Sequence, residues 1–121
     1  AVREFERVLT LRPADAATRR ELGDLLMERR EYRSAEKHYR EAMDGGLRDV
    51  RLLASLAGAL DANGKPREAV PLAEEAYARQ RNSRLGFELA KLYQKVGRAR
   101  DAARLLQKIE RDAGLADRPR E

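Results

Sequence analysis

The sequence contains no cysteine, no tryptophan and a single histidine, and aromatic residues make up only 5% of it. Without cysteine, disulfides, cysteine–histidine zinc sites and a cysteine nucleophile are excluded from this chain. No apolar run approaches the roughly 18 residues of a membrane-spanning helix, and no signal-peptide pattern is present. The absence of cysteine is compatible with the cytoplasm and with the periplasm. We expect a cytoplasmic location, with only a slight preference over the periplasm.

Charged residues are abundant instead. They make up 39% of the 121 residues, with 26 Lys and Arg against 21 Asp and Glu, so the formal net charge is +5. A chain of this length fits one domain, and its frequent Ala, Leu, Glu, Arg and Lys favour long helices. No stretch shows the alternation of apolar and polar residues that is typical of a strand. The net positive charge favours an acidic partner without identifying one.

Three segments of the chain repeat one another. They are ELGDLLMERREYRSAEKHYREAM (21–43), SLAGALDANGKPREAVPLAEEAY (55–77) and ELAKLYQKVGRARDAARLLQKIE (88–110), offset by 34 and then 33 residues. Such a period is the mark of a helical repeat array. Asp15, Asp49 and Asn82 precede the copies at the same distance and predict helix N-caps, because their side chains can accept from free backbone N–H groups.

Each copy predicts two antiparallel helices. The first carries apolar residues three and four apart, such as Leu22, Leu25 and Leu26, which is the spacing of a buried helix face. Small residues in the two helices, such as Gly23 and Ala35, leave room for a close approach. Pro66 fits the first turn of its helix. The sequence offers no account of Pro71, which lies further inside the same helix.

This pattern resembles the tetratricopeptide repeat, whose signature combines Leu-Gly in the first helix with Ala-x3-aromatic in the second. The match is clearest in LGDLL (22–26), AEKHY (35–39) and Ala42. Residues 1–16 resemble the second helix of an earlier repeat, with Ala1, Phe5, Val8 and Pro13 at the expected places. Arg19 and Ala73 depart from the signature, at its tryptophan and aromatic positions.

The resemblance implies an all-α fold, a right-handed α-α superhelix of seven helices. We expect a repeat domain over residues 1–113. It would contain a second helix at 1–12, full repeats at 15–48, 49–81 and 82–113, and a C-terminal tail at 114–121. The chain would be part of a larger protein.

In proteins of this kind the first helices line a concave groove that binds peptides or partner segments. The resemblance therefore implies a partner-binding groove formed by first-helix residues outside the apolar stripe. We expect these contacts to come from Arg20, Asp24, Met27, Arg51, Ala54, Gly58, Arg84, Phe87, Lys91 and Lys95. Further candidates on the same helices are Glu28, Asp61 and Gln94.

A depression is predicted in the middle of that groove. Ala54 and Gly58 lie four residues apart and so share one helix face, and Phe87 is an aromatic residue outside the stripe. Together with the cations around them, they predict a pocket for an apolar side chain flanked by Asp or Glu. The alternative is that Gly58 merely permits a close helix contact and that the charges form a solvated face.

We expect a non-catalytic adaptor or scaffold, with no catalytic residue, cofactor or metal site. The alternative is a scaffold for homo-oligomerisation through the convex face or the solenoid ends, at residues 1–11 or at Leu105 and Ile109. A less favoured reading is nucleic-acid binding along a basic edge, which Glu31, Glu68 and Asp101 interrupt. That edge would comprise Arg29, Arg30, Arg33, Lys65, Arg67, Lys95, Arg98 and Arg100.

A tail-binding carboxylate clamp, known from some relatives, is not expected. Its positions correspond here to Arg20, Asp24, Ser55, Arg84 and Glu88. Asp24 and Glu88 would place negative charge where the bound anion should lie.

Overall fold

The computed structural model describes residues 2, 3 and 15–117, with side chains up to Gly114. Within those residues the regular secondary structure is helical throughout, with turns and short loops between the helices and no strand. The helices are α2 (Ala16–Glu28), α3 (Tyr32–Asp44), α4 (Val50–Ala62), α5 (Pro66–Arg79), α6 (Ser83–Lys95) and α7 (Ala99–Asp117). The all-α prediction is therefore confirmed. The helix predicted at residues 1–12 lies, apart from Val2 and Arg3, outside the described residues.

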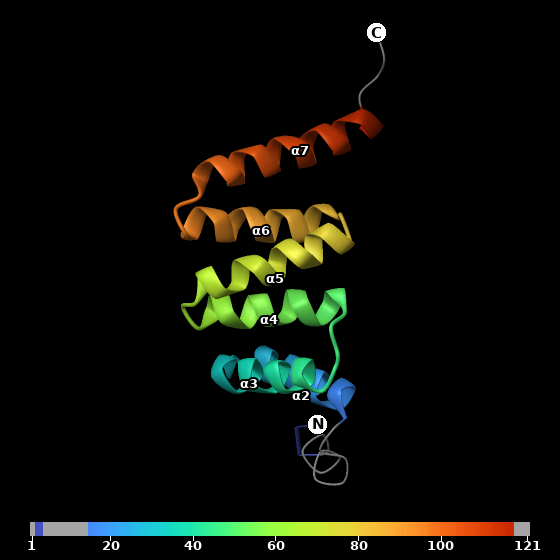
Figure 1. The fold of residues 1–121 in the computed structure, drawn as a ribbon, viewed down its shortest axis with the longest axis vertical. Helices are drawn as coiled ribbons and strands as arrows, with labels where there is room; N and C mark the ends of the chain where they lie inside the picture. Colours follow the sequence, from blue (N-terminus) through green and yellow to red (C-terminus); the bar gives the residue numbers. More distant parts are fainter. Residues whose placement is uncertain (1, 4–14, 118–121) are drawn as a thin grey trace.

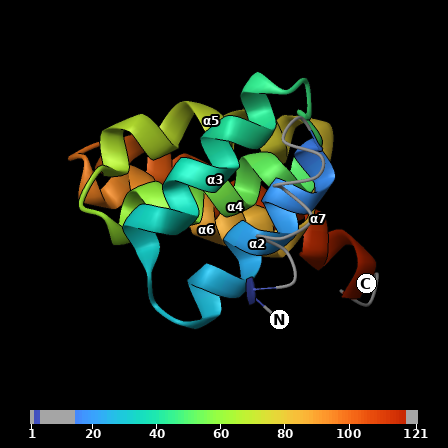
Figure 2. The same ribbon diagram turned by 90° about the horizontal axis from the view of Figure 1, so that it is seen from below.

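The helices stack in chain order, from α2 and α3 at one end of the molecule to α7 at the other (Figure 1). Each first helix packs against its own second helix, as in the pairs α2–α3 and α4–α5, and each second helix packs against the next first helix. Seen from below, α3 and α5 lie toward one side of the stack and α2 toward the other (Figure 2). The repeated helix pair is thus the structural unit.

The first helix of every pair begins at a side-chain cap, as the sequence predicted. The backbone N–H groups of Thr18, Leu52 and Leu85 donate to Asp15, Asp49 and Asn82 at 3.1, 2.8 and 2.8 Å. Each cap pairs one of the backbone donors that a helix start leaves free. The second helices α3 and α5 have no side-chain cap.

The core of the stack lies between the two helices of each pair and between neighbouring pairs. Its members include Leu22, Tyr39, Leu56 and Ala69, all nearly inaccessible to solvent. Tyr39 packs directly over Gly23, where a Cβ atom would lie 2.6 Å from the Tyr39 ring. A glycine is therefore required at this crossing by simple sterics, which explains the Leu-Gly pair in the first copy.

A second close approach was not foreseen from the sequence. At Gly86 in α6 a Cβ atom would lie 2.4 Å from Cδ1 of Ile109 and 3.1 Å from the Tyr77 ring. In this copy the glycine lies where the signature has a tryptophan. The larger residues of α5 and α7 fill the space that the absent side chain leaves.

The turns inside the pairs adopt a left-handed backbone conformation at one residue each. Gly64 and Gly97 have φ values of 77° and 81°, and the equivalent residue of the first pair is Arg30, with φ 60°. Glycine tolerates this conformation, whereas a residue with a Cβ atom is strained by about 1–2 kcal/mol. The first turn therefore carries strain that the other two avoid.

Helix α5 continues through Pro71, whose position inside a helix the sequence analysis did not explain. Proline cannot donate to the carbonyl group four residues earlier. Pro71 is exposed, so water can take the place of the missing donor at this position.

Helix α7 runs to Asp117 and so extends into the segment predicted as a tail from 114. Leu105 and Ile109, proposed above as a self-association surface, are buried against the core. In this structure Leu105 and Ile109 are therefore not accessible for contacts with another molecule. Among the described helices, none has the length and hydropathy that crossing a membrane would require.

Glu36 joins the first two helix pairs and is the buried charged side chain of the described core. Its carboxylate accepts from Asn63 Nδ2 at 2.8 Å, from Arg40 Nε at 2.9 Å and from Lys65 Nζ at 3.1 Å. Burial would raise the pKa of Glu36, but the hydrogen bonds from Asn63, Arg40 and Lys65 outweigh it and hold the pKa below its usual value. The Glu36 carboxylate therefore links α3 to the turn before α5, through Asn63 and Lys65.

Candidate functional site

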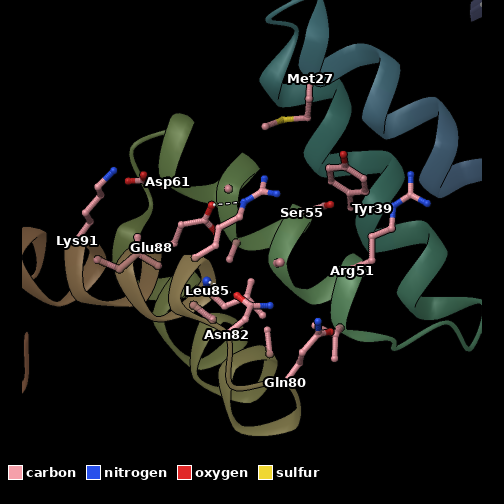
Figure 3. A pocket seen from close by; sticks show the side chains of 18 of the residues that line it. Met27, Tyr39, Arg51, Ser55, Asp61, Gln80, Asn82, Leu85, Glu88 and Lys91 are labelled. Atoms are coloured by element: carbon pink, nitrogen blue, oxygen red, sulfur yellow. Dashed lines mark hydrogen bonds and ion pairs between the residues drawn. The ribbon is translucent and has the colours of Figure 1, made fainter. Parts of the chain in front are cut away.

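A cavity of about 840 Å³ opens between the three first helices α2, α4 and α6, and we call it the first-helix cavity. Residues from α2 and α4, such as Met27 and Arg51, lie on one side of it, and Glu88 and Lys91 of α6 lie on the other (Figure 3). The connection between α5 and α6 contributes Gln80 and Asn82 at one end. The first helices thus do form a hollow, as the resemblance implied.

Most of the predicted partner-binding residues line this cavity. They are Asp24, Met27, Arg51, Ala54, Gly58, Arg84 and Lys91, together with the further candidates Glu28 and Asp61. The predicted residues Arg20, Phe87 and Lys95 do not line it. Phe87 is 48% exposed and does not line the cavity, although it lies three residues after Arg84 and four before Lys91 and so is their neighbour on the surface of α6.

The floor of the cavity is unusually open at Gly58. A Cβ atom on Gly58 would approach only Met27 Cε, at 3.9 Å, which is an ordinary contact distance. Gly58 is exposed and lies within α4, where glycine costs about 0.5–1 kcal/mol relative to alanine. Packing therefore does not require this glycine, unlike Gly23 and Gly86. The alternative that Gly58 permits a close helix contact is not supported by the geometry.

The predicted cationic rim is largely neutralised by carboxylates of neighbouring helices. Arg51 pairs with Asp24 at 2.6 Å, Lys95 with Asp61 at 2.7 Å, and Arg20 with Asp49 at 2.6 Å. Arg84 lies 3.5 Å from Glu88 and remains 87% exposed. The cavity wall therefore carries mixed charge, with cations tied to carboxylates, rather than a continuous positive surface.

Asp24 connects the core to the cavity wall. Its carboxylate accepts from the Tyr39 hydroxyl at 2.5 Å and, through its other oxygen, from Arg51 Nη2 at 2.6 Å. Burial, and then the hydrogen bond to Asp24, raises the pKa of Tyr39 well above its usual value, so Tyr39 stays a hydrogen-bond donor. The buried Tyr39 thus positions Asp24, and Asp24 in turn positions the Arg51 side chain at the cavity wall.

Asp49 has a similar double role at the start of α4. It caps the helix by accepting from Leu52 N and it pairs with Arg20. Burial would raise the pKa of Asp49, but the backbone bond from Leu52 and the Arg20 charge outweigh it and lower the pKa. Arg20, with 14% of its side chain exposed, thus aligns α2 with α4 and is not a free ligand contact.

Several lining residues were not predicted as contacts. Gln80, Asn82, Leu85 and Leu92 come from the α5–α6 connection and from the flank of α6. From the sequence, Asn82 was interpreted only as a helix cap. Helical spacing contained a usable signal for Glu88, because Glu88 follows Arg84 by four residues, about one helical turn.

The basic edge predicted along the turns is also interrupted by ion pairs. Lys65 pairs with Glu36 at 3.1 Å, and Arg98 pairs with Asp101 at 2.8 Å while lying 4.6 Å from the Tyr93 ring centre. These contacts take up cations that phosphate binding would need. Within the described residues no cluster of His, Asp and Glu is arranged to hold a metal ion.

The first helix pair is the part of the chain that matches a family model. Residues 16–46, which form α2, α3 and the start of the following loop, match the model of the tetratricopeptide repeat. This segment is therefore similar to a tetratricopeptide repeat. It contains Gly23 beneath Tyr39 and the buried Ala35 and Ala42, the residues on which the sequence resemblance depended. No curated protein matches the chain in sequence.

Several solved structures share the fold of nearly all of this chain. YrrB, described as a TPR protein with an unusual peptide-binding site, superposes with a TM-score of 0.87 at 19% identity over 96% of this chain and 61% of YrrB. MamA superposes with a TM-score of 0.84 at 17% identity, over 90% of this chain and 64% of MamA. MamA of Desulfovibrio magneticus RS-1 superposes with a TM-score of 0.86 at 19% identity, over 97% of this chain and 67% of that MamA chain.

At these identities the likeness establishes the fold, and the chain is a tetratricopeptide-like helical solenoid. The chain spans less than two thirds of the length of YrrB and of the first MamA structure.

Proposed function

We propose that this chain is a protein-interaction module whose first-helix cavity binds a short partner segment, with a large apolar side chain of the partner seated over Gly58. The tetratricopeptide repeat at residues 16–46 supports an interaction role in general. The binding unit would be the repeats at 15–48, 49–81 and 82–113. No step of the proposal needs catalysis.

The observation that carries the proposal is the open floor at Gly58. A mid-helix glycine with no neighbour closer than Met27 Cε weakens α4 without a packing reason, and the space that it leaves belongs to the cavity. Met27 beside it is unbranched and adapts to different shapes. A buried apolar anchor of this kind supplies much of the affinity of peptide complexes.

Filling that space tests the proposal. Linear peptides would be selected from a displayed random library on the 121-residue chain, and their affinities measured by fluorescence anisotropy. Leucine at Gly58 would occupy the anchor site, so Gly58→Leu should weaken the selected peptides roughly 10- to 100-fold, the value of one buried aliphatic side chain.

The matched control is Ala78→Leu, which adds a similar side chain to an exposed position of α5 outside the cavity. It should leave the affinity unchanged, and circular dichroism should show both variants folded. Selected peptides that bind Gly58→Leu as tightly as the parent chain would show that the cavity is not the binding site.

A second candidate function is self-association, favoured by Phe87. It is the large hydrophobic side chain most exposed among those described, at 48%, and it lies on α6 near the end of the stack (Figure 1). Light scattering at rising concentration would test it. Growth in mass that Phe87→Glu abolishes would support self-association, and a monomer at all concentrations would remove it.

A further inference from the structure

Two charged side chains of the first-helix cavity are unpaired within the part of the chain that the structure describes. Glu28, the last residue of α2, and Lys91 of α6 both line the cavity and are exposed. Among the described residues neither has a hydrogen-bond or ion-pair partner, whereas Asp24, Arg51, Asp61, Arg84 and Glu88 all do. The wall therefore presents one uncompensated negative charge on α2 and one uncompensated positive charge on α6.

The open floor lies between these two charges. Gly58 belongs to α4, which stands between α2 and α6 along the stack. Met27, the neighbour of Glu28, faces the cavity from the side opposite to Lys91 (Figure 3). A ligand that crosses the cavity over Gly58 thus meets a negative group before the floor and a positive group after it.

We propose that the cavity selects a partner segment in which a large apolar residue is flanked by one basic and one acidic residue. The basic residue lies over α2 at Glu28, the apolar residue over α4 at Gly58, and the acidic residue over α6 at Lys91. This inference rests on the proposed function and adds to it the charge pattern and orientation of the ligand. It replaces the expectation of acidic residues on both sides, because the other rim cations are already paired.

Peptide selection on charge-reversed variants tests the pattern without assuming a chain direction. Random linear peptides would be selected separately on the parent chain, on Glu28→Lys and on Lys91→Glu. The parent should enrich one basic and one acidic flank around an apolar residue. Glu28→Lys should enrich two acidic flanks and Lys91→Glu two basic flanks, since each variant presents one sign on both sides.

Affinities of synthetic peptides give the second readout. A peptide selected on the parent should bind Glu28→Lys and Lys91→Glu roughly 3- to 10-fold more weakly, the scale of exposed charge pairs, and the differences should shrink at high salt. The matched controls are Lys37→Glu in α3 and Glu110→Lys in α7, which reverse exposed charges outside the cavity. They should change neither the selected pattern nor the affinity.

The outcomes separate this inference from the proposed function. If every selection yields an apolar residue whose binding Gly58→Leu abolishes, while the flanking charges do not follow the variants, the charge pattern is overturned and the binding site stands. If the selected peptides bind Gly58→Leu normally, the proposed function fails, whatever charges they carry.

Discussion

At the scale of single residues, the glycines of this chain have opposite physical roles. Gly23 and Gly86 are covered by side chains that a Cβ atom would strike, whereas a Cβ atom on Gly58 would meet only Met27 Cε, at a contact distance of 3.9 Å. The sequence shows the same residue type on the first helices in each case. Only the distances to neighbouring atoms distinguish a glycine that packing requires from one that leaves room for something else.

Exchanging these glycines for alanine should therefore have opposite effects on stability. Gly23→Ala should lower the free energy of unfolding by about 1–3 kcal/mol, because its Cβ atom would overlap the buried Tyr39 ring. Gly58→Ala should raise it by about 0.5–1 kcal/mol, because the helix gains a better helix former at no steric cost. Urea unfolding followed by circular dichroism measures both. Equal effects at the two positions would contradict this assignment.

Arg30 gives a third prediction at this scale. Because its φ of 60° is the conformation that Gly64 and Gly97 adopt in the other turns, Arg30→Gly should relieve strain. The gain should be about 0.5–1 kcal/mol after the greater freedom of glycine in the unfolded chain is subtracted. The thermal unfolding midpoint should rise accordingly. A lower midpoint would mean that the Arg30 side chain makes a stabilising contact.

At the scale of helices and turns, the starts of the first helices could be predicted from the sequence and their lateral contacts could not. The caps depend on residues three positions apart, as in Asp49 and Leu52, so local sequence is sufficient. The pairs Arg20–Asp49, Arg51–Asp24 and Lys95–Asp61 join residues 29, 27 and 34 positions apart. Their partners depend on how the repeats stack, and the sequence alone suggested a free cationic rim.

The misplacement of Phe87 has a similar cause. Phe87 lies three residues after Arg84 and four before Lys91, so helical spacing places it beside them. Arg84 and Lys91 line the cavity, whereas Phe87 does not. Where the border of the cavity crosses this side of α6 depends on how the helix pairs stack, which the sequence does not show.

The contact between Glu36 and the α4–α5 turn predicts a loss of stability in acid. Its folded-state pKa is lowered, so protonation favours the unfolded chain. The stabilisation is complete above the ordinary glutamate pKa of about 4.3 and is lost as the pH falls through the lower folded-state value. Glu36→Gln should make unfolding less dependent on pH below that point. An unchanged acid profile in this variant would show that Glu36 does not contribute.

At the scale of the whole molecule, each helix pair contacts only its neighbours along the stack. Stability in such an array is approximately a sum of the repeat and interface contributions. The central pair α4–α5 has a neighbour on both sides, and its residues Leu52, Leu53, Leu56 and Leu60 are almost fully buried. The middle of the stack should therefore be its most stable part.

Leu56→Ala should accordingly lower the free energy of unfolding by about 2–5 kcal/mol, the cost of removing a fully buried leucine side chain. In the parent chain, amide hydrogen exchange should be slowest in α4 and α5 and faster toward the end of α7. Denaturant titration and exchange measured by mass spectrometry test the two expectations. Uniform exchange rates along all helices would contradict the neighbour-only arrangement.

The hydrogen bond from Tyr39 to Asp24 has a practical consequence for work on this molecule. A phenol that donates to a carboxylate emits weakly, and a ligand that draws Arg51 away from Asp24 would alter that bond at its other end. With no tryptophan in the chain, tyrosine emission can be read without a brighter background. Occupancy of the cavity should thus be visible as a change in intrinsic fluorescence, with no dye attached to the protein.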